Sequence, residues 1–164
     1  MFPLFHIAVP LVLFELPPIK RRLKVNRFAL ILGAFLPDII DKFLLLLKIS
    51  SGRGISHTLL FVGIVSLIAF FISKKNLAIS IPFLSGNIIH LILDLPYVPL
   101  FYPFIPYDFS MVENPIGGWF YSLLHNPLIY GTELAGLGIL IFIMVSNKLY
   151  SFNHIITYLK TQEP

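Results

Sequence analysis

The stretch Asn87-Ile88-Ile89-His90-Leu91-Ile92-Leu93-Asp94 decides the fold of this 164-residue chain. It places a histidine and an aspartate four residues apart among aliphatic residues, near the end of an apolar segment. Residues at i and i+4 lie above one another on one face of a helix, so the pattern predicts a helix with a polar pair on an apolar surface. A carboxylate there costs about 3 kcal/mol or less to insert into a bilayer, and it therefore needs a partner.

The composition is that of a membrane protein. Hydrophobic residues make up 57% of the chain and charged residues 12%, whereas a soluble domain carries about 25% charged residues. The net charge of +4 bears on orientation in the membrane and on anionic lipids, and we expect no nucleic acid as a partner. The absence of cysteine excludes disulfides, thiolate ligands and cysteine nucleophiles. The length indicates one domain, residues 1–164.

Apolar segments recur along the chain and predict an all-α, integral membrane bundle of five hydrophobic helices. The first segment is short for a full span of about 20 residues. Ser56 is the expected N-cap of the third helix, which places His57 in its first turn. Pro37 is expected to kink the second helix, and Gly131 and Ala135 have the small-xxx-small spacing of packed helices. The five segments cover residues 1–16, 28–47, 55–73, 77–95 and 127–146.

The distribution of Lys and Arg predicts the orientation. Five basic residues lie in 17–27 and two in 74–76, whereas 48–54 has two and 96–126 has none. The basic turns are therefore expected in the cytoplasm and the N-terminus outside. This orientation brings most of the buried polar residues toward the external face of the membrane, where we expect one site.

Histidines and carboxylates within the apolar segments form a candidate metal site. A mixed nitrogen and oxygen set suits zinc best, with manganese or iron as alternatives, whereas calcium and magnesium prefer oxygen alone. A divalent cation supplies the charge that buried carboxylates lack, and it lowers the pKa of a bound water towards about 7. Arg53, on a glycine-flanked loop, is a candidate clamp for a phosphate, and Asn87 is a candidate for orienting a ligand. The candidate metal ligands are His6, Asp38, Asp41, His57, His90 and Asp94.

Each of these residues also has a simpler structural explanation. His90 and Asp94 could be a polar pair that joins helices, and Asp38 could form an ion pair with Lys42 or belong to a proton relay. His57 alone could be a capping residue, and Arg53 could face lipid headgroups. Three functions therefore stay open from the residues alone: a metal-dependent hydrolase, a non-enzymatic protein that moves protons or metal ions, and a structural membrane scaffold.

Three ordered blocks carry a resemblance to a known family. They are Leu36-Pro37-Asp38-Ile39-Ile40-Asp41, Arg53-Gly54-Ile55-Ser56-His57-Thr58, and Gly86 through Asp94 with the pattern G-x-x-x-H-x-x-x-D. Together with a histidine in the first helix, here His6, they resemble the YdjM-like predicted membrane-bound metal-dependent hydrolases, also called LexA-binding, inner-membrane-associated hydrolases. The resemblance covers about residues 1–105.

The order of these ligands is more distantly similar to that of the zinc-dependent phospholipase C and single-strand nuclease group. This likeness implies that Asp38 or Asp41, His57, His90 and Asp94 hold the main ion, and that His6 holds a neighbouring ion with Asp94 as the bridge. The chain lacks the H-x-x-x-E of the soluble enzymes, so the likeness does not extend to a three-metal cluster.

The expected function is therefore metal-dependent cleavage of a phosphoester by a metal-activated water. The substrate could be a lipid headgroup that reaches the site from the bilayer, so membrane lipids are the expected partners. Asp41 or Asp38, whichever is not a ligand, is the expected general base, and Arg53 is expected to stabilise charge on the phosphate oxygens.

Overall fold

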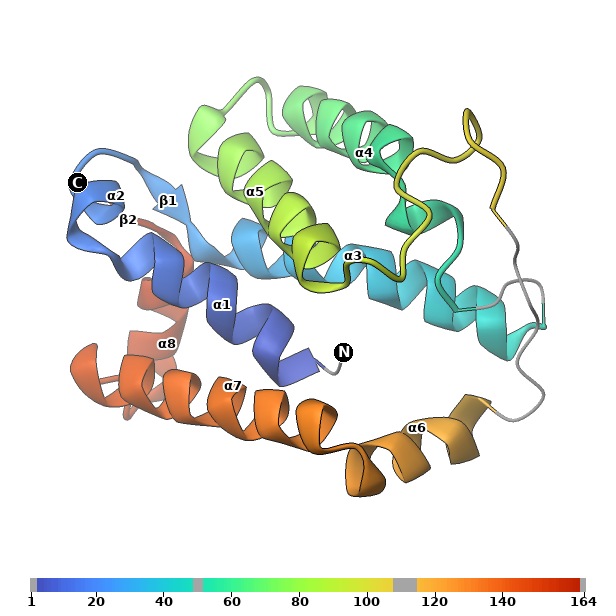
Figure 1. Cartoon of the computed structure of the whole chain (residues 1–164). Coiled ribbons are helices and arrows are strands. Elements are labelled where there is room, and N and C mark those ends of the chain that lie inside the picture. The colour runs from blue at the N-terminus through green and yellow to red at the C-terminus, as the bar shows by residue number, and fades with distance from the viewer. Residues whose placement is uncertain (1–2, 49–51, 108–114, 163–164) are drawn as a thin grey trace.

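The computed structural model describes residues 3–48, 52–107 and 115–162. These residues form an all-α fold, as predicted, and each of the five predicted segments contains a helix (Figure 1). A single 3-10 turn covers Ile55–His57, and two short strands, β1 (Val25–Asn26) and β2 (Thr161–Gln162), pair antiparallel. The helices are α1 (Pro3–Glu15), α2 (Pro17–Lys20), α3 (Arg27–Leu46), α4 (Leu59–Ile72), α5 (Leu77–Leu93), α6 (Pro115–His125), α7 (Pro127–Ser146) and α8 (Phe152–Leu159).

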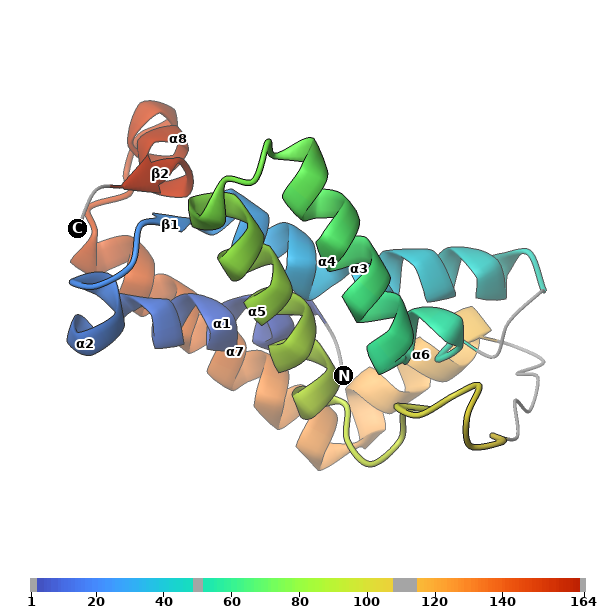
Figure 2. The ribbon, with the colours of Figure 1, turned by 90° about the horizontal axis from the view of Figure 1, so that it is seen from above.

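Helices α3 and α5 run in the same direction and cross at an angle, and their backbones touch at the crossing (Figures 1 and 2). A Cβ atom added to Gly33 would lie 2.1 Å from the carbonyl oxygen of Phe83, and one added to Gly86 would lie 2.2 Å from that of Leu30. Only glycine permits an approach this close. The contact brings the middle of α3 beside the second half of α5 (Figures 1 and 2), which are the parts that carry the predicted aspartates and His90.

Helix α7 packs along α1 and holds its N-terminal end. The carboxylate of Glu133 accepts hydrogen bonds from the backbone N–H groups of Leu4 and Phe5 at 3.1 and 3.2 Å. These donors belong to the first turn of α1, which has no helical acceptor for them. The small residue at this contact is Gly136, where a Cβ would lie 2.7 Å from the nitrogen of Phe5. The predicted Gly131 instead has open space around it among the described residues, because it faces away from α1.

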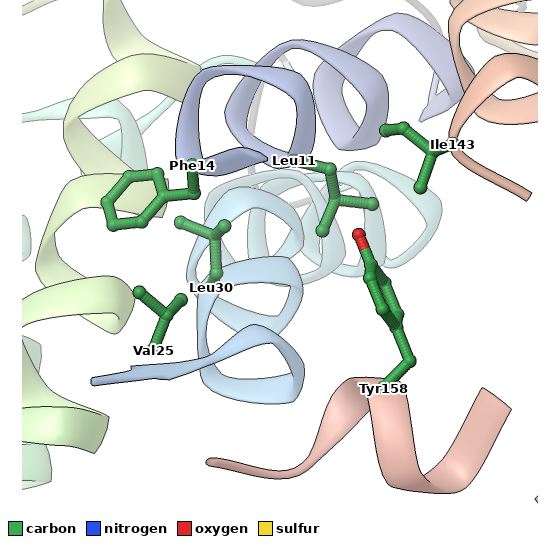
Figure 3. Packing of buried hydrophobic residues seen from close by; sticks show 6 residues of the cluster. All are labelled: Leu11, Phe14, Val25, Leu30, Ile143 and Tyr158. Atoms are coloured by element: carbon green, nitrogen blue, oxygen red, sulfur yellow. The ribbon is translucent and has the colours of Figure 1, made fainter. Parts of the chain in front are cut away.

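The apolar core lies at the other end of α1. Side chains from α1, α3, α7, α8 and β1 meet there, and Figure 3 shows the hydroxyl of Tyr158 directed towards α1. This hydroxyl donates to Glu15 Oε1 at 2.9 Å, and the buried Arg27 pairs with the same carboxylate at 2.6 Å. Burial and the negative charge of Glu15 raise the pKa of Tyr158 above its ordinary value of 10.0. The cluster comprises Leu11, Phe14, Val25, Leu30, Ile143 and Tyr158.

The helices are less uniformly suited to a bilayer than the sequence predicts. Within the part of the chain that the structure describes, α7, with 20 residues, is the one helix long and apolar enough to cross a membrane. Helices α4 and α5 have 14 and 17 residues, and α3 carries Asp38, Asp41 and Lys42. Apolar side chains are nevertheless exposed along α4, among them Leu67, Phe71 and Ile72. Such a surface is typical of contact with lipid or with a partner.

Two local predictions in the ligand-bearing segments need correction. Thr58, not Ser56, is the N-cap of α4, because Thr58 has extended backbone angles and its hydroxyl accepts the N–H of Phe61. His57 therefore lies before α4, in the 3-10 turn. The Ser56 hydroxyl instead donates to the carbonyl oxygen of Pro37 at 2.7 Å. Pro37, where the sequence predicts a kink, lies inside α3, which continues to Leu46.

Candidate metal centre

Four of the predicted ligands meet in one buried cluster. Asp38 comes from α3, His57 from the 3-10 turn, His90 from α5, and Asp94 from the C-cap of α5. Each offers a nitrogen or oxygen atom, and these four atoms lie within 4.8 Å of one another. All four side chains are buried, and both histidines are 0% exposed. Residues as far apart in the sequence as Asp38 and Asp94 therefore share one small volume.

His57 lies at the centre of the cluster. Its Nε2 atom is 3.6 Å from Asp38 Oδ1 and 3.6 Å from Asp94 Oδ2. The Nε2 atom of His90 is 3.9 Å from the same oxygen of Asp94. The two carboxylates thus face the Nε2 side of both imidazole rings, which is the side that can take up a cation.

The opposite side of each ring is already hydrogen-bonded. His90 Nδ1 is 2.7 Å from the carbonyl oxygen of Ala34. Because a carbonyl oxygen only accepts, Nδ1 of His90 carries the hydrogen and its Nε2 presents a lone pair. His57 Nδ1 is 2.7 Å from Asp41 Oδ2. When Nδ1 donates to this carboxylate and the ring is neutral, Nε2 of His57 also presents a lone pair. A histidine that binds a metal characteristically donates its other N–H to a carbonyl or carboxylate in this way.

The spacing of the two Nε2 atoms fits a shared cation. They lie 3.2 Å apart, and two neutral rings with lone pairs at both positions cannot form a hydrogen bond with each other. Two nitrogens bound to one tetrahedral zinc at about 2.0–2.1 Å are separated by about 3.3 Å. Two imidazoles and two carboxylates also form the mixed donor set that zinc, manganese and iron accept. The residues present therefore fit a divalent metal.

Asp41 lies behind His57 and outside the four-residue cluster. Its Oδ2 atom accepts from His57 Nδ1 and, at 2.6 Å, from the backbone N–H of Gly54. Its Oδ1 atom is 3.5 Å from the nitrogen of Ser56. The carboxylate thus fixes both the ring of His57 and the loop that carries it. This placement suits an orienting role, whereas the sequence suggested a ligand or a general base.

Two further predicted residues, His6 and Arg53, approach the cluster at Asp94. His6 Nε2 lies 3.5 Å from Asp94 Oδ1, and its ring centroid is 4.4 Å from that of His90. Arg53 Nε lies 3.5 Å from Asp94 Oδ2, and its side chain is 39% exposed. His6 thus closes the buried side of the cluster, and Arg53 lies where the cluster meets the surface.

Two more residues, Lys42 and Tyr97, contact the site. Lys42 Nζ lies 2.5 Å from Asp38 Oδ2, so the ion pair that the i, i+4 spacing allowed is present beside the cluster. Tyr97 presents its ring to the Arg53 guanidinium, 6.0 Å from carbon to centroid. Nothing in the sequence singled out Tyr97 among the aromatics of segment 96–126. Asn87 donates to the carbonyl oxygen of Phe83, and its buried Oδ1 has no hydrogen-bond partner in the described residues.

Two polar residues of the C-terminal half, Glu133 and His125, make contacts outside the cluster. Glu133 caps α1. His125 is exposed, stacks on Tyr121 and donates to its carbonyl oxygen.

Comparison with known proteins identifies one family. A family model described as YdjM inner membrane protein matches residues 1–158, which extends the likeness far beyond the three sequence blocks. No curated protein and no solved structure matches the chain.

Proposed function

Because the chain belongs to the YdjM inner membrane protein family, we propose that it is a membrane-bound, metal-dependent hydrolase that cleaves a phosphoester. The observation that supports this most is the pair of Nε2 atoms of His57 and His90, 3.2 Å apart between two buried carboxylates. Two imidazole nitrogens this close, with two buried carboxylates around them, make a donor set that a cation holds together.

Asp38, His57, His90 and Asp94 are the residues that would hold the metal, with zinc as the expected ion. The metal would act as a Lewis acid and make a water molecule a better nucleophile at neutral pH. Buried carboxylates and the absence of bulk water strengthen these electrostatic effects. Asp41 contributes from behind by holding the ring of His57, and the carbonyl oxygen of Ala34 does the same for His90.

Asp38 is the better placed of the two candidate general bases. Its Oδ1 atom faces His57, and its Oδ2 atom faces Lys42. We propose that Asp38 combines both roles, as a ligand through Oδ1 and as the acceptor of the proton of an attacking water, in place of the division between the two aspartates that the sequence suggested; Lys42 beside Oδ2 keeps the carboxylate ionised. Asp41 has its Oδ2 engaged by both His57 and Gly54, which leaves it the positioning role.

Arg53 is placed to bind the phosphate. Its side chain is partly exposed while its Nε lies 3.5 Å from Asp94, so the guanidinium group connects the surface with the buried cluster. A planar guanidinium binds two phosphate oxygens at once and stabilises the negative charge that develops on them during attack. Tyr97, 67% exposed, supports the guanidinium from one side. A headgroup of a membrane lipid is the substrate that this position favours, because the loop around Tyr97 exposes Phe101 and Phe104.

The test combines elemental analysis with a turnover assay on the full chain in detergent. Wild-type protein is expected to carry about one divalent ion per chain or more, and to hydrolyse a generic phosphodiester or release headgroups from mixed lipids. His90→Ala combined with Asp94→Ala should abolish both metal retention and turnover. His125→Ala, which changes an exposed histidine outside the cluster, is the matched control.

The two alternative functions give different results in the same experiment. Metal binding without turnover of any phosphoester, together with ion uptake into vesicles, would establish the transport alternative. A stable protein without bound metal would overturn the hydrolase proposal and favour a scaffold.

A further inference from the structure

A second pocket lies at the opposite end of α5 from the candidate metal centre. It has a volume of about 370 Å³ and lies between the segment that precedes α3 and the first turns of α5. The metal centre takes its α5 residues from His90 and Asp94, whereas this pocket takes them from Leu77 to Pro82. Its volume falls within the range of pockets that bind small ligands, about 300–1,000 Å³.

The pocket is basic at one side and apolar at the other. Arg22 and Lys24 contribute the positive charge, and no carboxylate is among the described residues that line it. Leu77, Ile81 and Pro82 form the apolar wall on α5. The exposed Lys74 and Lys75 come directly before Asn76, which also lines the pocket. The electrostatic potential at the basic side is therefore positive.

This combination matches an amphiphile with an anionic head. A free anion would gain nothing from the apolar wall, and a neutral apolar ligand would gain nothing from two cations. Both basic segments are those that the charge distribution places in the cytoplasm, where the membrane leaflet presents anionic phospholipids. The exposed side chains of Leu77 and Ile81 continue the apolar wall to the surface of α5, so an acyl chain can leave the pocket along the helix.

We propose that Arg22, Lys24 and the first turns of α5 form a binding site for an anionic phospholipid of the leaflet on the side away from the metal centre. The phosphate group contacts Arg22 and Lys24, and the beginning of an acyl chain lies against Leu77 and Ile81. The site is separate from the proposed hydrolytic site, and it does not depend on metal binding.

The test measures binding of three probes to the full chain in a neutral detergent, by thermal shift and by native mass spectrometry. Phosphatidylglycerol should bind saturably, and phosphatidylcholine and inorganic phosphate should bind much more weakly. R22Q/K24Q should weaken phosphatidylglycerol binding about 30-fold, since each basic residue near an anionic surface contributes about a factor of five. Ala78→Phe, which fills the pocket from its lining, should also weaken binding.

The control is K48Q/K148Q, which removes the same charge from exposed positions outside the pocket and should change affinity by less than about twofold. Equal losses in R22Q/K24Q and in the control would overturn the proposal in favour of diffuse electrostatic attraction. Inorganic phosphate binding as tightly as phosphatidylglycerol, or full lipid binding by folded Ala78→Phe, would overturn it as well. Metal content serves as the independent measurement and should remain at the wild-type level in every variant.

Discussion

His57 and His90 present their Nε2 atoms to each other at 3.2 Å, while Asp41 and the carbonyl oxygen of Ala34 engage the opposite nitrogens. The two rings come from the 3-10 turn and from α5, and the buried Asp38 and Asp94 complete the group. Each hydrogen bond behind a ring fixes which nitrogen points inward. Asp41 and the carbonyl oxygen of Ala34 therefore orient the two rings toward a candidate cation site without being ligands themselves.

Removal of metal should destabilise the protein. A ligand present at about 100 times its dissociation constant stabilises the folded state by about 2.7 kcal/mol, so chelation should lower the thermal midpoint and added zinc should restore it. His90→Gln should abolish this response, and the exposed His125→Gln should leave it intact. Thermal unfolding in detergent with and without a chelator measures the effect. An identical midpoint in both conditions for metal-loaded wild type would contradict the prediction.

Asp41→Asn separates an orienting role from ligation. The amide can still contact His57 Nδ1, but it lacks the charge, so metal affinity should fall about 10–100-fold. Asp94→Asn removes a carboxylate of the cluster itself and should lose the metal altogether. Titration of zinc against a chromophoric chelator gives both affinities. Equal losses in the two variants would show that Asp41 is a ligand, as the sequence alone allowed.

Arg53→Ala should impair phosphoester hydrolysis without loss of metal. Removal of one donor to the developing oxyanion costs about 100-fold or more in kcat, and Arg53→Lys should recover only part of it because lysine lacks the planar fork. The exposed Arg21→Ala is the control. Steady-state kinetics with metal analysis of the same samples test this. If Arg53→Ala kept the wild-type kcat, the guanidinium group would have no part in the reaction.

The backbone contact between α3 and α5 should tolerate no added methyl group. Gly33→Ala places a Cβ 2.1 Å from the carbonyl oxygen of Phe83, so the helices must move apart, at a cost of about 1–3 kcal/mol or more. Metal retention should fall too, because the movement separates Asp38 from His90. Gly138→Ala, with open space around it among the described residues, should stabilise α7 by about 0.5–1 kcal/mol. Denaturant unfolding of both variants gives the comparison, and equal midpoints would refute the expected contact.

Tyr158 should make stability depend on alkaline pH. Burial and Glu15 raise the pKa of Tyr158 above 10.0, so at pH values below 10.0 the phenol is neutral in both the folded and the unfolded chain. Above 10.0 the unfolded chain releases the proton first, and stability therefore falls as pH rises. Tyr158→Phe should lower the free energy of unfolding by about 1 kcal/mol at neutral pH. The stability of this variant should then fall less steeply than that of the wild type as the pH rises above 10.0. Thermal midpoints across this range measure it, with the exposed Tyr150→Phe as the control that keeps the wild-type slope.

The helices of the bundle could be predicted because long apolar runs leave few alternatives. Segments 28–47 and 77–95 correspond closely to α3 and α5. The length of each helix, and whether it is long enough to cross a membrane, could not be predicted. Polar caps and charged residues shorten the uninterrupted apolar stretches of α3, α4 and α5. The pairing of β1 with β2 and the contact of α8 with α3 join distant segments, which no local pattern records.

The site could be predicted as a set, but not its internal order. Asp38, His57, His90 and Asp94 stood out as polar residues in apolar surroundings, and the structure brings them together. Asp38 and Asp41 were indistinguishable by spacing, because both lie on one face of α3. The 3-10 turn before α4 decides between them, since it directs Nδ1 of His57 to Asp41 and Nε2 to Asp38.

The two hydrogen bonds from Leu4 and Phe5 to Glu133 have a consequence for biosynthesis. Ribosomes make α1 before α7, so Leu4 and Phe5 cannot donate to Glu133 until α7 has been translated. His6, the residue after Phe5 in α1, contacts Asp94 of the candidate metal centre. Nascent chains that stall before α7 therefore lack the carboxylate that caps the helix carrying His6.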